Sequence, residues 1–247
     1  MAVTNKDFGT LIEANENLFD TKEFTDMVFV IHGKELPAHK IIVGSRSSVL
    51  KTWTHGPMAP KNGKYLVNDP RIDFYDFENF IRYLYTDNCV INETNVKRMM
   101  HLGDMYLKSL LEKCISKIVT WFHADNILRY AELGLLYIHS CTLLNKCFEA
   151  FPTFVTPFPF SYFSDDGVSH LITPKLALKI VEICPRSKIL TEDLLFKKVS
   201  EWAELKAAEQ RNLGNPSTDY ITIMAPIIPH FMFERMTPIT LTKYVYP

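Results

Sequence analysis

The sequence has no long hydrophobic run and no leader-like N-terminus. Its apolar stretches stay below the ~20 residues that a membrane-spanning helix needs. Its opening, MAVTNKDFGT, lacks the basic and then apolar layout of a secretory signal. We therefore expect a soluble intracellular protein, located in the cytoplasm and with access to the nucleus.

Paired cysteine motifs are also lacking. The cysteines are odd in number, and no two of them have the C-x-x-C spacing of a zinc or redox site. Unpaired cysteine usually behaves as a small buried apolar residue, so we expect that role here and no metal site. The residues are Cys89, Cys114, Cys141, Cys147 and Cys184.

Catalytic motifs are missing as well. The nine glycines are scattered and form no P-loop or dinucleotide-binding turn, and neither G-x-S-x-G nor H-E-x-x-H occurs. His139-Ser140-Cys141 and Asp165-Asp166 are adjacent only in sequence, whereas catalysis needs placement in space. The 27 basic and 28 acidic residues are interspersed, unlike the basic patch of a nucleic-acid-binding protein. We expect no enzyme, no cofactor, and no nucleic-acid or membrane partner.

The most informative segment spans residues 24–47, FTDMVFVIHGKELPAHKIIVGSRS. Its pattern predicts a strand over 27–31, a turn at His32-Gly33, and a return strand that ends at Pro37. A helix is then predicted by apolar residues at spacings of three and four, namely Ala38, Ile41, Ile42, Val49, Leu50 and Trp53. The segment is thus a hairpin followed directly by an amphipathic helix.

The rest of the chain divides into two halves. A short strand is predicted at 65–67, and helices are predicted over 73–85, from an N-cap at Asn92, and over 108–121. After about residue 124 the readable periodicity is helical, over 127–137, 138–148, 176–183 and 194–208. A mixed half followed by a helical half predicts two modules, with a boundary near 121–125.

Three features of the first half resemble the signature of the BTB (POZ) domain. They are Asp26, the run Pro37-Ala38-His39-Lys40, and the run Ser45-Arg46-Ser47. BTB domains are dimerising interaction modules, so the resemblance implies a binding protein rather than a catalyst.

The second half resembles a BACK domain. Residues 123–128, 131–133 and 190–196 carry the resemblance, and 227–241 is similar to the closing region of that family. The combined resemblance implies an α+β BTB/POZ domain, a small mixed sheet flanked by helices, followed by an all-α BACK helical domain. We expect the BTB/POZ domain at 18–122, an N-terminal dimerisation helix region at 1–17, and the BACK domain at 123–243.

The resemblance implies a homodimer. In the family, an apolar helix before the first strand packs across the two-fold axis, which assigns Phe8, Leu11, Ile12, Leu18 and Phe19 to the interface. The alternative is that this helix folds onto its own core.

Asp26 and Lys40 match a charged pair that BTB domains place near the dimer interface. One interpretation is a partly buried ion pair that fixes the register of the dimer, since such pairs are costly to break. The other is local bracing of the hairpin against the helix, and one pair can serve both roles.

The resemblance also implies binding to the N-terminal domain of cullin-3, a ubiquitin-ligase scaffold. We assign Met58, Ala59, Tyr85 and Asp87 to this surface. Family adaptors present a hydrophobic-x-Glu motif where this chain has Met58-Ala59-Pro60. The missing glutamate is expected to weaken the contact rather than abolish it. Tyr85 is alternatively an aromatic residue that completes a core stripe.

Residues 151–163, FPTFVTPFPFSYF, combine six aromatic residues with three prolines. The prolines exclude a continuous helix, so we expect these rings to lie on extended chain. The stretch is either a partner-docking surface or part of the core of the second module.

Two functions remain open. The first is a homodimeric adaptor that recruits cullin-3 and presents an unknown protein substrate for ubiquitination, which the BACK-like half favours. The alternative is a non-degradative scaffold that dimerises or caps other BTB proteins without binding cullin. Met58-Ala59-Pro60 and the lack of a third, substrate-binding domain in this sequence favour the alternative.

Overall fold

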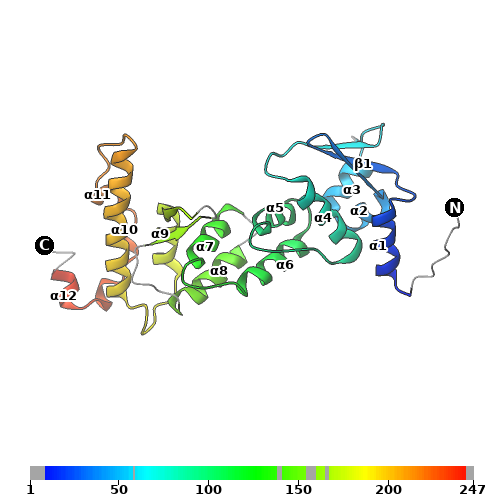
Figure 1. Cartoon of the computed structure of the whole chain (residues 1–247). Helices are drawn as coiled ribbons and strands as arrows, with labels where there is room; N and C mark the ends of the chain where they lie inside the picture. Colours follow the sequence, from blue (N-terminus) through cyan, green and yellow to red (C-terminus); the bar gives the residue numbers. More distant parts are fainter. Residues whose placement is uncertain (1–8, 58, 138–140, 154–159, 165–166, 243–247) are drawn as a thin grey trace. The chain divides into compact units, whose positions relative to one another are not determined.

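The structure, a computed structural model, describes residues 9–57, 59–137, 141–153, 160–164 and 167–242 of the chain. The chain divides into two units, Met1–Lys117 and Ile118–Pro247. Figure 1 colours it from blue at the N-terminus to red at the C-terminus. Each unit has a core of its own and is described by itself.

A three-stranded sheet forms the framework of the first unit, in the order β2-β1-β3. The middle strand β1 (Met27–Ile31) pairs antiparallel with β2 (Lys34–Ala38) and parallel with β3 (Lys64–Val67). The turn between β1 and β2 has φ values of 48° at His32 and 81° at Gly33, as a primed two-residue hairpin turn requires. The predicted strand at 27–31 and its turn are confirmed.

The helices of the first half are α1 (Leu11–Thr21), α2 (Lys40–Arg46), α3 (Ser48–His55), α4 (Phe74–Thr86), α5 (Val96–Tyr106) and α6 (Lys108–Val119). The helices predicted over 73–85 and 108–121 are confirmed as α4 and α6. Helix α5 begins one turn later than predicted because Asn92 forms a turn of its own. Its Oδ1 atom accepts hydrogen bonds from the backbone N–H groups of Thr94 and Asn95, at 3.1 and 3.0 Å.

The prediction of a single helix after the hairpin was wrong, because the segment forms two helices, α2 and α3. Ala38 still belongs to β2, and Ser47 separates α2 from α3 with extended backbone angles, φ −132° and ψ 119°. The Ser47 hydroxyl accepts a hydrogen bond from the backbone N–H of Leu50 and donates one to the carbonyl of Tyr106. A serine that caps a new helix in this way competes with continuation of the old one.

The second unit contains α7 (Ile127–Leu136), α8 (Cys141–Ala150), α9 (Pro174–Ile183), α10 (Glu192–Asn212), α11 (Tyr220–Met224) and α12 (Pro238–Thr240), with short 3-10 helices η2 (Phe151–Thr153), η3 (Ile228–His230) and η4 (Phe233–Arg235). The long helix α10 packs against α11 (Figure 1). Helices predicted over 127–137, 176–183 and 194–208 are confirmed. Of the helix predicted over 138–148, residues 138–140 lie outside the described residues.

The second half is helical as predicted, but it also contains a short hairpin that periodicity did not reveal. Strands β4 (Ser161–Phe163) and β5 (Ser169–Leu171) pair antiparallel, with Tyr162 opposite His170. Strands of three residues are too short to show an alternating pattern, which needs at least four residues to be recognised.

Buried polar contacts organise the core of the second unit. The indole N–H of Trp202 donates to the carbonyl of Ile172 at 3.1 Å. Arg186 Nε and Glu192 Oε2 form an almost fully buried ion pair at 2.6 Å. The other carboxylate oxygen of Glu192 accepts the backbone N–H of Met232 at 3.0 Å. The two contacts of Glu192 attach the segments before and after α10 to the start of that helix, and the Trp202 bond attaches Ile172 to its middle.

Three of the five cysteines, Cys114, Cys147 and Cys184, are buried as expected, whereas Cys89 is half-buried. Burial raises the pKa of the Cys184 thiol to about 12, so this thiol stays neutral. Within the described ranges, no helix has both the length and the apolar content needed to cross a bilayer.

Gly103 permits the close approach of α5 to α6, which leads to a prediction. A Cβ atom at this position would lie 2.6 Å from the backbone nitrogen of Leu111 and 2.9 Å from its Cα atom. Main-chain atoms cannot rotate away, so Gly103→Ala must push the helices apart, at a cost of about 1–3 kcal/mol. We expect a lower free energy of unfolding in urea, followed by circular dichroism.

Gly44→Ala is the matched control, because Gly44 is also a buried helical glycine of the first unit. Its nearest neighbours would be side-chain atoms of His55, at 3.1 and 3.3 Å, and that side chain can rotate. Equal losses of stability in the two variants would contradict the proposed main-chain clash.

Candidate protein-interaction surfaces

Tyr85 forms a buried hydrogen-bonded latch with His39 and Glu23, which we call the Tyr85 latch. The Tyr85 hydroxyl accepts the backbone N–H of His39 at 2.9 Å and lies 2.7 Å from His39 Nδ1. His39 Nε2 lies 2.6 Å from the carbonyl oxygen of Glu23. A carbonyl oxygen only accepts, so Nε2 donates, and in the neutral ring Nδ1 then accepts the hydroxyl proton of Tyr85. The latch joins the end of α4 to the β2–α2 junction and the turn after α1.

The environment of Tyr85 is that of a core residue. The residue is only 3% exposed, and burial raises the pKa of its hydroxyl to about 12, against the opposing effect of the His39 N–H bond. This agrees with the alternative in which Tyr85 completes a core stripe. The role of Tyr85 as a partner contact remains a prediction. Its burial leaves little of the ring exposed to a partner.

Phe19 is also turned inward. Its ring is buried and packs edge-on against Tyr85, with 5.2 Å between ring centroids. The Lys22 ammonium lies 3.4 Å from the centroid of the Phe19 ring, and the Arg82 guanidinium carbon lies 4.6 Å from it. Leu18 is half-buried. For these two residues the helix folds onto its own core, as the alternative interpretation stated.

Polar bonds hold α1 against α4. Arg82 of α4 forms ion pairs with Glu16 at 3.3 Å and Asp20 at 2.6 Å, and Asn15 Nδ2 donates to the carbonyl of Tyr85 at 3.2 Å. Because α1 is fixed in this way, its remaining side chains face outward on a rigid support.

Leu11 and Ile12 lie on that outer side, 77% and 53% exposed. Two further apolar residues that sequence reasoning missed are exposed as well, Phe24 at 85% and Ile41 at 74%. Phe24 stands beside Glu23 and Ile41 beside Lys40, so the hydrogen bonds Glu23–His39 and Asp26–Lys40 bring their two segments together. We call Leu11, Ile12, Phe24 and Ile41 the exposed apolar set. Phe8, the other predicted interface residue, lies outside the described residues.

Asp26 and Lys40 meet, but through a different bond from the predicted ion pair. Asp26 Oδ1 accepts a hydrogen bond from the backbone N–H of Lys40 at 2.8 Å. Both residues are described, and no contact within 4.0 Å joins the Lys40 ammonium to the Asp26 carboxylate. The bond caps the start of α2, where a carboxylate satisfies a free N–H group. This bond supports the local bracing role, and an ion pair of these side chains at a dimer interface stays a prediction.

The residues assigned to cullin binding are only partly described. Met58 lies outside the described residues, and Ala59 and Pro60 are half-buried in the loop between α3 and β3. Asp87 is exposed at the end of α4, has φ 56°, and forms an ion pair with Arg46, whose Nη1 lies 3.3 Å from Asp87 Oδ2. Its role at a partner surface stays a prediction.

The two ends of the aromatic and proline-rich stretch lie in the second unit. Phe151 and Phe160 are buried with their ring centroids 5.8 Å apart, whereas Phe163 is exposed. The described rings thus include both core and surface positions. Residues 154–159, which contain the other rings of the stretch, lie outside the described residues. Among the residues that the structure describes, no cluster of His, Cys, Asp or Glu has the arrangement of a metal site.

Comparison with known proteins gives matches over both halves of the chain. A family model for the BTB/POZ domain matches residues 15–120. BTB/POZ domain-containing protein 6 of Xenopus laevis is 24% identical over 214 residues, which cover 85% of this chain and 38% of that protein. Kelch-like protein 2 of Rattus norvegicus is 24% identical over 226 residues, 88% of this chain and 35% of that protein.

A solved structure of the BTB domain of human gigaxonin is also similar, with 20% identity and a TM-score of 0.37. The match covers 46% of this chain and 95% of that one. The first curated relatives are much longer than this chain, which spans 22% to 38% of their length.

The Tyr85 latch predicts the effect of removing one oxygen atom. Tyr85→Phe keeps the ring against Phe19 but leaves the N–H of His39 without its buried partner, which should cost about 1–3 kcal/mol. We expect a clear loss in the free energy of unfolding, measured by urea denaturation.

Tyr83→Phe provides the control for this experiment. Tyr83 is buried on the same helix, but its hydroxyl makes only a long 3.4 Å contact with Ser109 Oγ. We expect a loss below about 1 kcal/mol. The latch would be energetically unimportant if both variants lost the same stability.

Proposed function

We propose that this chain, whose residues 15–120 form a BTB/POZ domain, is a homodimeric protein-interaction adaptor that recruits cullin-3 and presents a bound protein for ubiquitination. The observation that carries the proposal is the exposed apolar set of a BTB/POZ domain. Similarity to kelch-like and BTB proteins supports an adaptor role over most of the chain.

The exposed apolar set favours a dimer. Large exposed apolar groups on a soluble protein commonly mark an interaction site, and these four side chains lie on α1, the turn after it and the start of α2. Burial of each would contribute about 1.5–3 kcal/mol. A second copy of the same surface is the natural partner in a two-fold dimer, because isologous symmetry pairs a patch with itself.

The proposed cullin surface comprises Met58, Ala59 and Asp87, with Tyr85 beneath it. Tyr85 would act by positioning the end of α4, where Asp87 is exposed. Met58 would supply the apolar anchor, and Asp87 would supply charge. Pro60 stands where family adaptors have glutamate, so we expect an affinity lower than that of an adaptor with the full motif.

The second unit completes the proposal. We propose that residues 123–243 form a BACK domain and that 18–122 bound the BTB/POZ domain. The helices of the second unit and the buried ion pair that fixes its closing segment support a stable module of this kind. A cytoplasmic location, with access to the nucleus, is part of the same proposal.

A scaffold that caps other BTB proteins is the second candidate. Met58-Ala59-Pro60, without the glutamate, is the specific observation that favours it. The two functions share the dimer surface and differ only in cullin binding. A measurement of cullin binding therefore distinguishes them.

Charged substitutions in the exposed apolar set should split the dimer. Phe24→Glu combined with Ile41→Glu places two buried charges per subunit in the interface, which is strongly unfavourable. By light scattering after gel filtration, the wild type should show twice the chain mass of 28.6 kDa, and the double variant should show a single chain.

Leu66→Glu is the control for the dimer test, because Leu66 is an exposed apolar residue on β3, outside the exposed apolar set. It should leave the dimer intact. A wild-type mass of 28.6 kDa at ~10 μM would rule out a dimer of the strength expected from this burial.

Calorimetry with the cullin-3 N-terminal domain tests ligase recruitment. Met58→Asp should weaken binding by roughly tenfold or more, because a lost anchor is worth about 1.5–3 kcal/mol. Leu66→Glu should bind like the wild type. No heat with the wild-type dimer at ~10 μM would contradict the adaptor function and leave the scaffold, whose own test is mixed-dimer formation with other BTB domains.

A further inference from the structure

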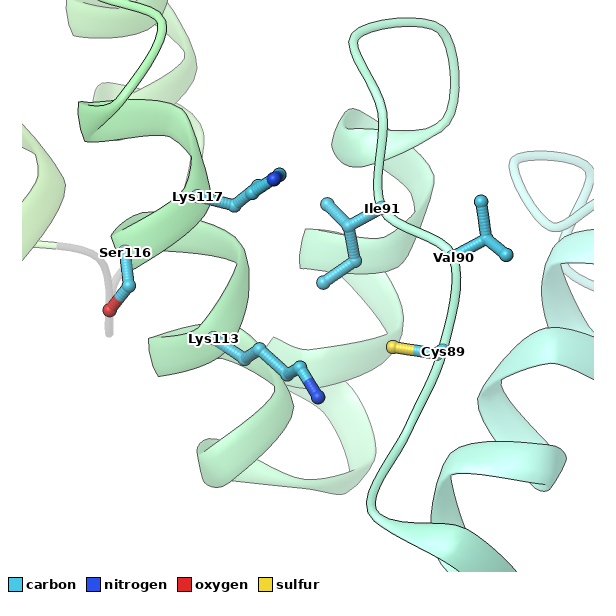
Figure 2. Close-up of a pocket in the computed structure, with 6 residues that line it drawn as sticks. All are labelled: Cys89, Val90, Ile91, Lys113, Ser116 and Lys117. Carbon is cyan, nitrogen blue, oxygen red and sulfur yellow. The ribbon is translucent and has the colours of Figure 1, made fainter.

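An open pocket lies between the loop after α4 and helix α6, next to Asp87 but lined by residues that are not assigned to dimerisation or cullin binding. Its volume is about 500 Å³. The lining residues are Cys89, Val90, Ile91, Lys113, Ser116 and Lys117 (Figure 2). All of them belong to the first unit. The pocket therefore lies within one compact unit of the chain.

The main chain of this loop is held on one side by side-chain amides. Asn79 Nδ2 donates to the carbonyl of Val90 at 2.7 Å, and Asn79 Oδ1 accepts the N–H of Val90 at 3.0 Å. The amide of Asn95 adds a bond to the same carbonyl at 3.0 Å. Asn79 thus bonds both main-chain groups of Val90 as a neighbouring strand would.

The main-chain groups on either side of Val90 have no hydrogen-bond partner among the described residues. Figure 2 shows the side chains of Cys89 and Ile91 turned toward α6 and that of Val90 turned away, the alternation of an extended segment. In such a segment, consecutive residues direct their N–H and C=O groups to opposite edges. Within the part of the chain that the structure describes, neither Cys89 nor Ile91 has a hydrogen bond to its N–H or C=O group. Within the described residues, one edge of the loop therefore carries main-chain groups that no protein group bonds.

The charge beside this open edge is positive. Lys113 and Lys117 extend from α6 into the pocket (Figure 2). The Lys113 ammonium donates to the carbonyl of Asp87 at 2.7 Å, and a neutral carbonyl leaves its charge uncancelled. Two carboxylates of these segments form ion pairs with other residues, Asp87 with Arg46 and Glu112 with Lys108.

We propose that this edge binds an acidic peptide segment of a partner protein in extended conformation. The segment would exchange hydrogen bonds with Cys89 and Ile91, place apolar side chains against Ile91, and direct carboxylates to Lys113 and Lys117. Strand addition of this kind obtains affinity from main-chain bonds and selectivity from side-chain contacts. The proposal goes beyond the adaptor function, because it requires neither the dimer nor cullin-3.

Fluorescence polarisation with a synthetic probe tests it on the full chain. The probe is a labelled peptide of about seven residues that alternates glutamate with valine, ~23 Å long when extended. We expect measurable binding that weakens as salt is raised, because exposed charges are screened. The same peptide with lysine in place of glutamate should not bind, since its charges would be repelled.

Variants on each side of the contact separate its two components. Lys113→Glu combined with Lys117→Glu should weaken binding by about tenfold or more. Lys108→Glu, on the exposed side of the same helix, should change it less than about twofold. A probe with N-methyl groups on alternate residues keeps its charge but loses the donors for the strand edge, and it should also bind at least about tenfold more weakly.

Three outcomes would overturn the proposal. They are no binding of the acidic probe at ~1 mM, binding that is indifferent to the double lysine variant, and equal binding of the N-methylated probe. Circular dichroism of each variant distinguishes lost binding from lost folding.

Discussion

The buried hydroxyl of Tyr85 is the contact on which the first unit depends. It lies where three segments far apart in sequence converge, and its two bonds to His39 leave neither a buried donor nor a buried acceptor unsatisfied on the latch. His39 in turn fixes the carbonyl of Glu23. Phe24 follows Glu23 directly, and Ile41 lies two residues after His39, so this arrangement positions the segments that carry both exposed side chains. A polar contact in the core thus determines the geometry of an apolar surface.

The sequence predicted the elements more accurately than the contacts. Strand β1 and helices α4, α6, α9 and α10 have long or regular apolar patterns, and these were found at or near the predicted residues. The break at Ser47 was missed because it depends on local hydrogen bonds. The hairpin of β4 and β5 was missed because strands of three residues are too short to show a pattern. Periodicity reports which side of an element is buried, and it says little about where the chain bends.

The candidate surfaces show the same limit. Asp26 and Lys40 were expected to meet, and they do. The bond runs to the main-chain N–H of Lys40, and a contact of this kind cannot be inferred from residue types alone. Phe19 and Leu11 belong to one apolar stripe in the sequence, yet the first is buried and the second is exposed. Only the position of α4, with Arg82 beside the Phe19 ring, determines which side of α1 faces inward. Phe24 carried no periodic signal, since it stands alone before the strand.

The pairing of Asn79 with Val90 has a consequence for how this protein can change over evolutionary time. Both bonds go to main-chain atoms, so they make no demand on which side chains the loop carries. Substitutions at positions 89–91 can alter the chemistry of the adjoining pocket while the path of the chain is preserved. The fold therefore separates the residue that sets the shape of the loop from the residues that can diversify.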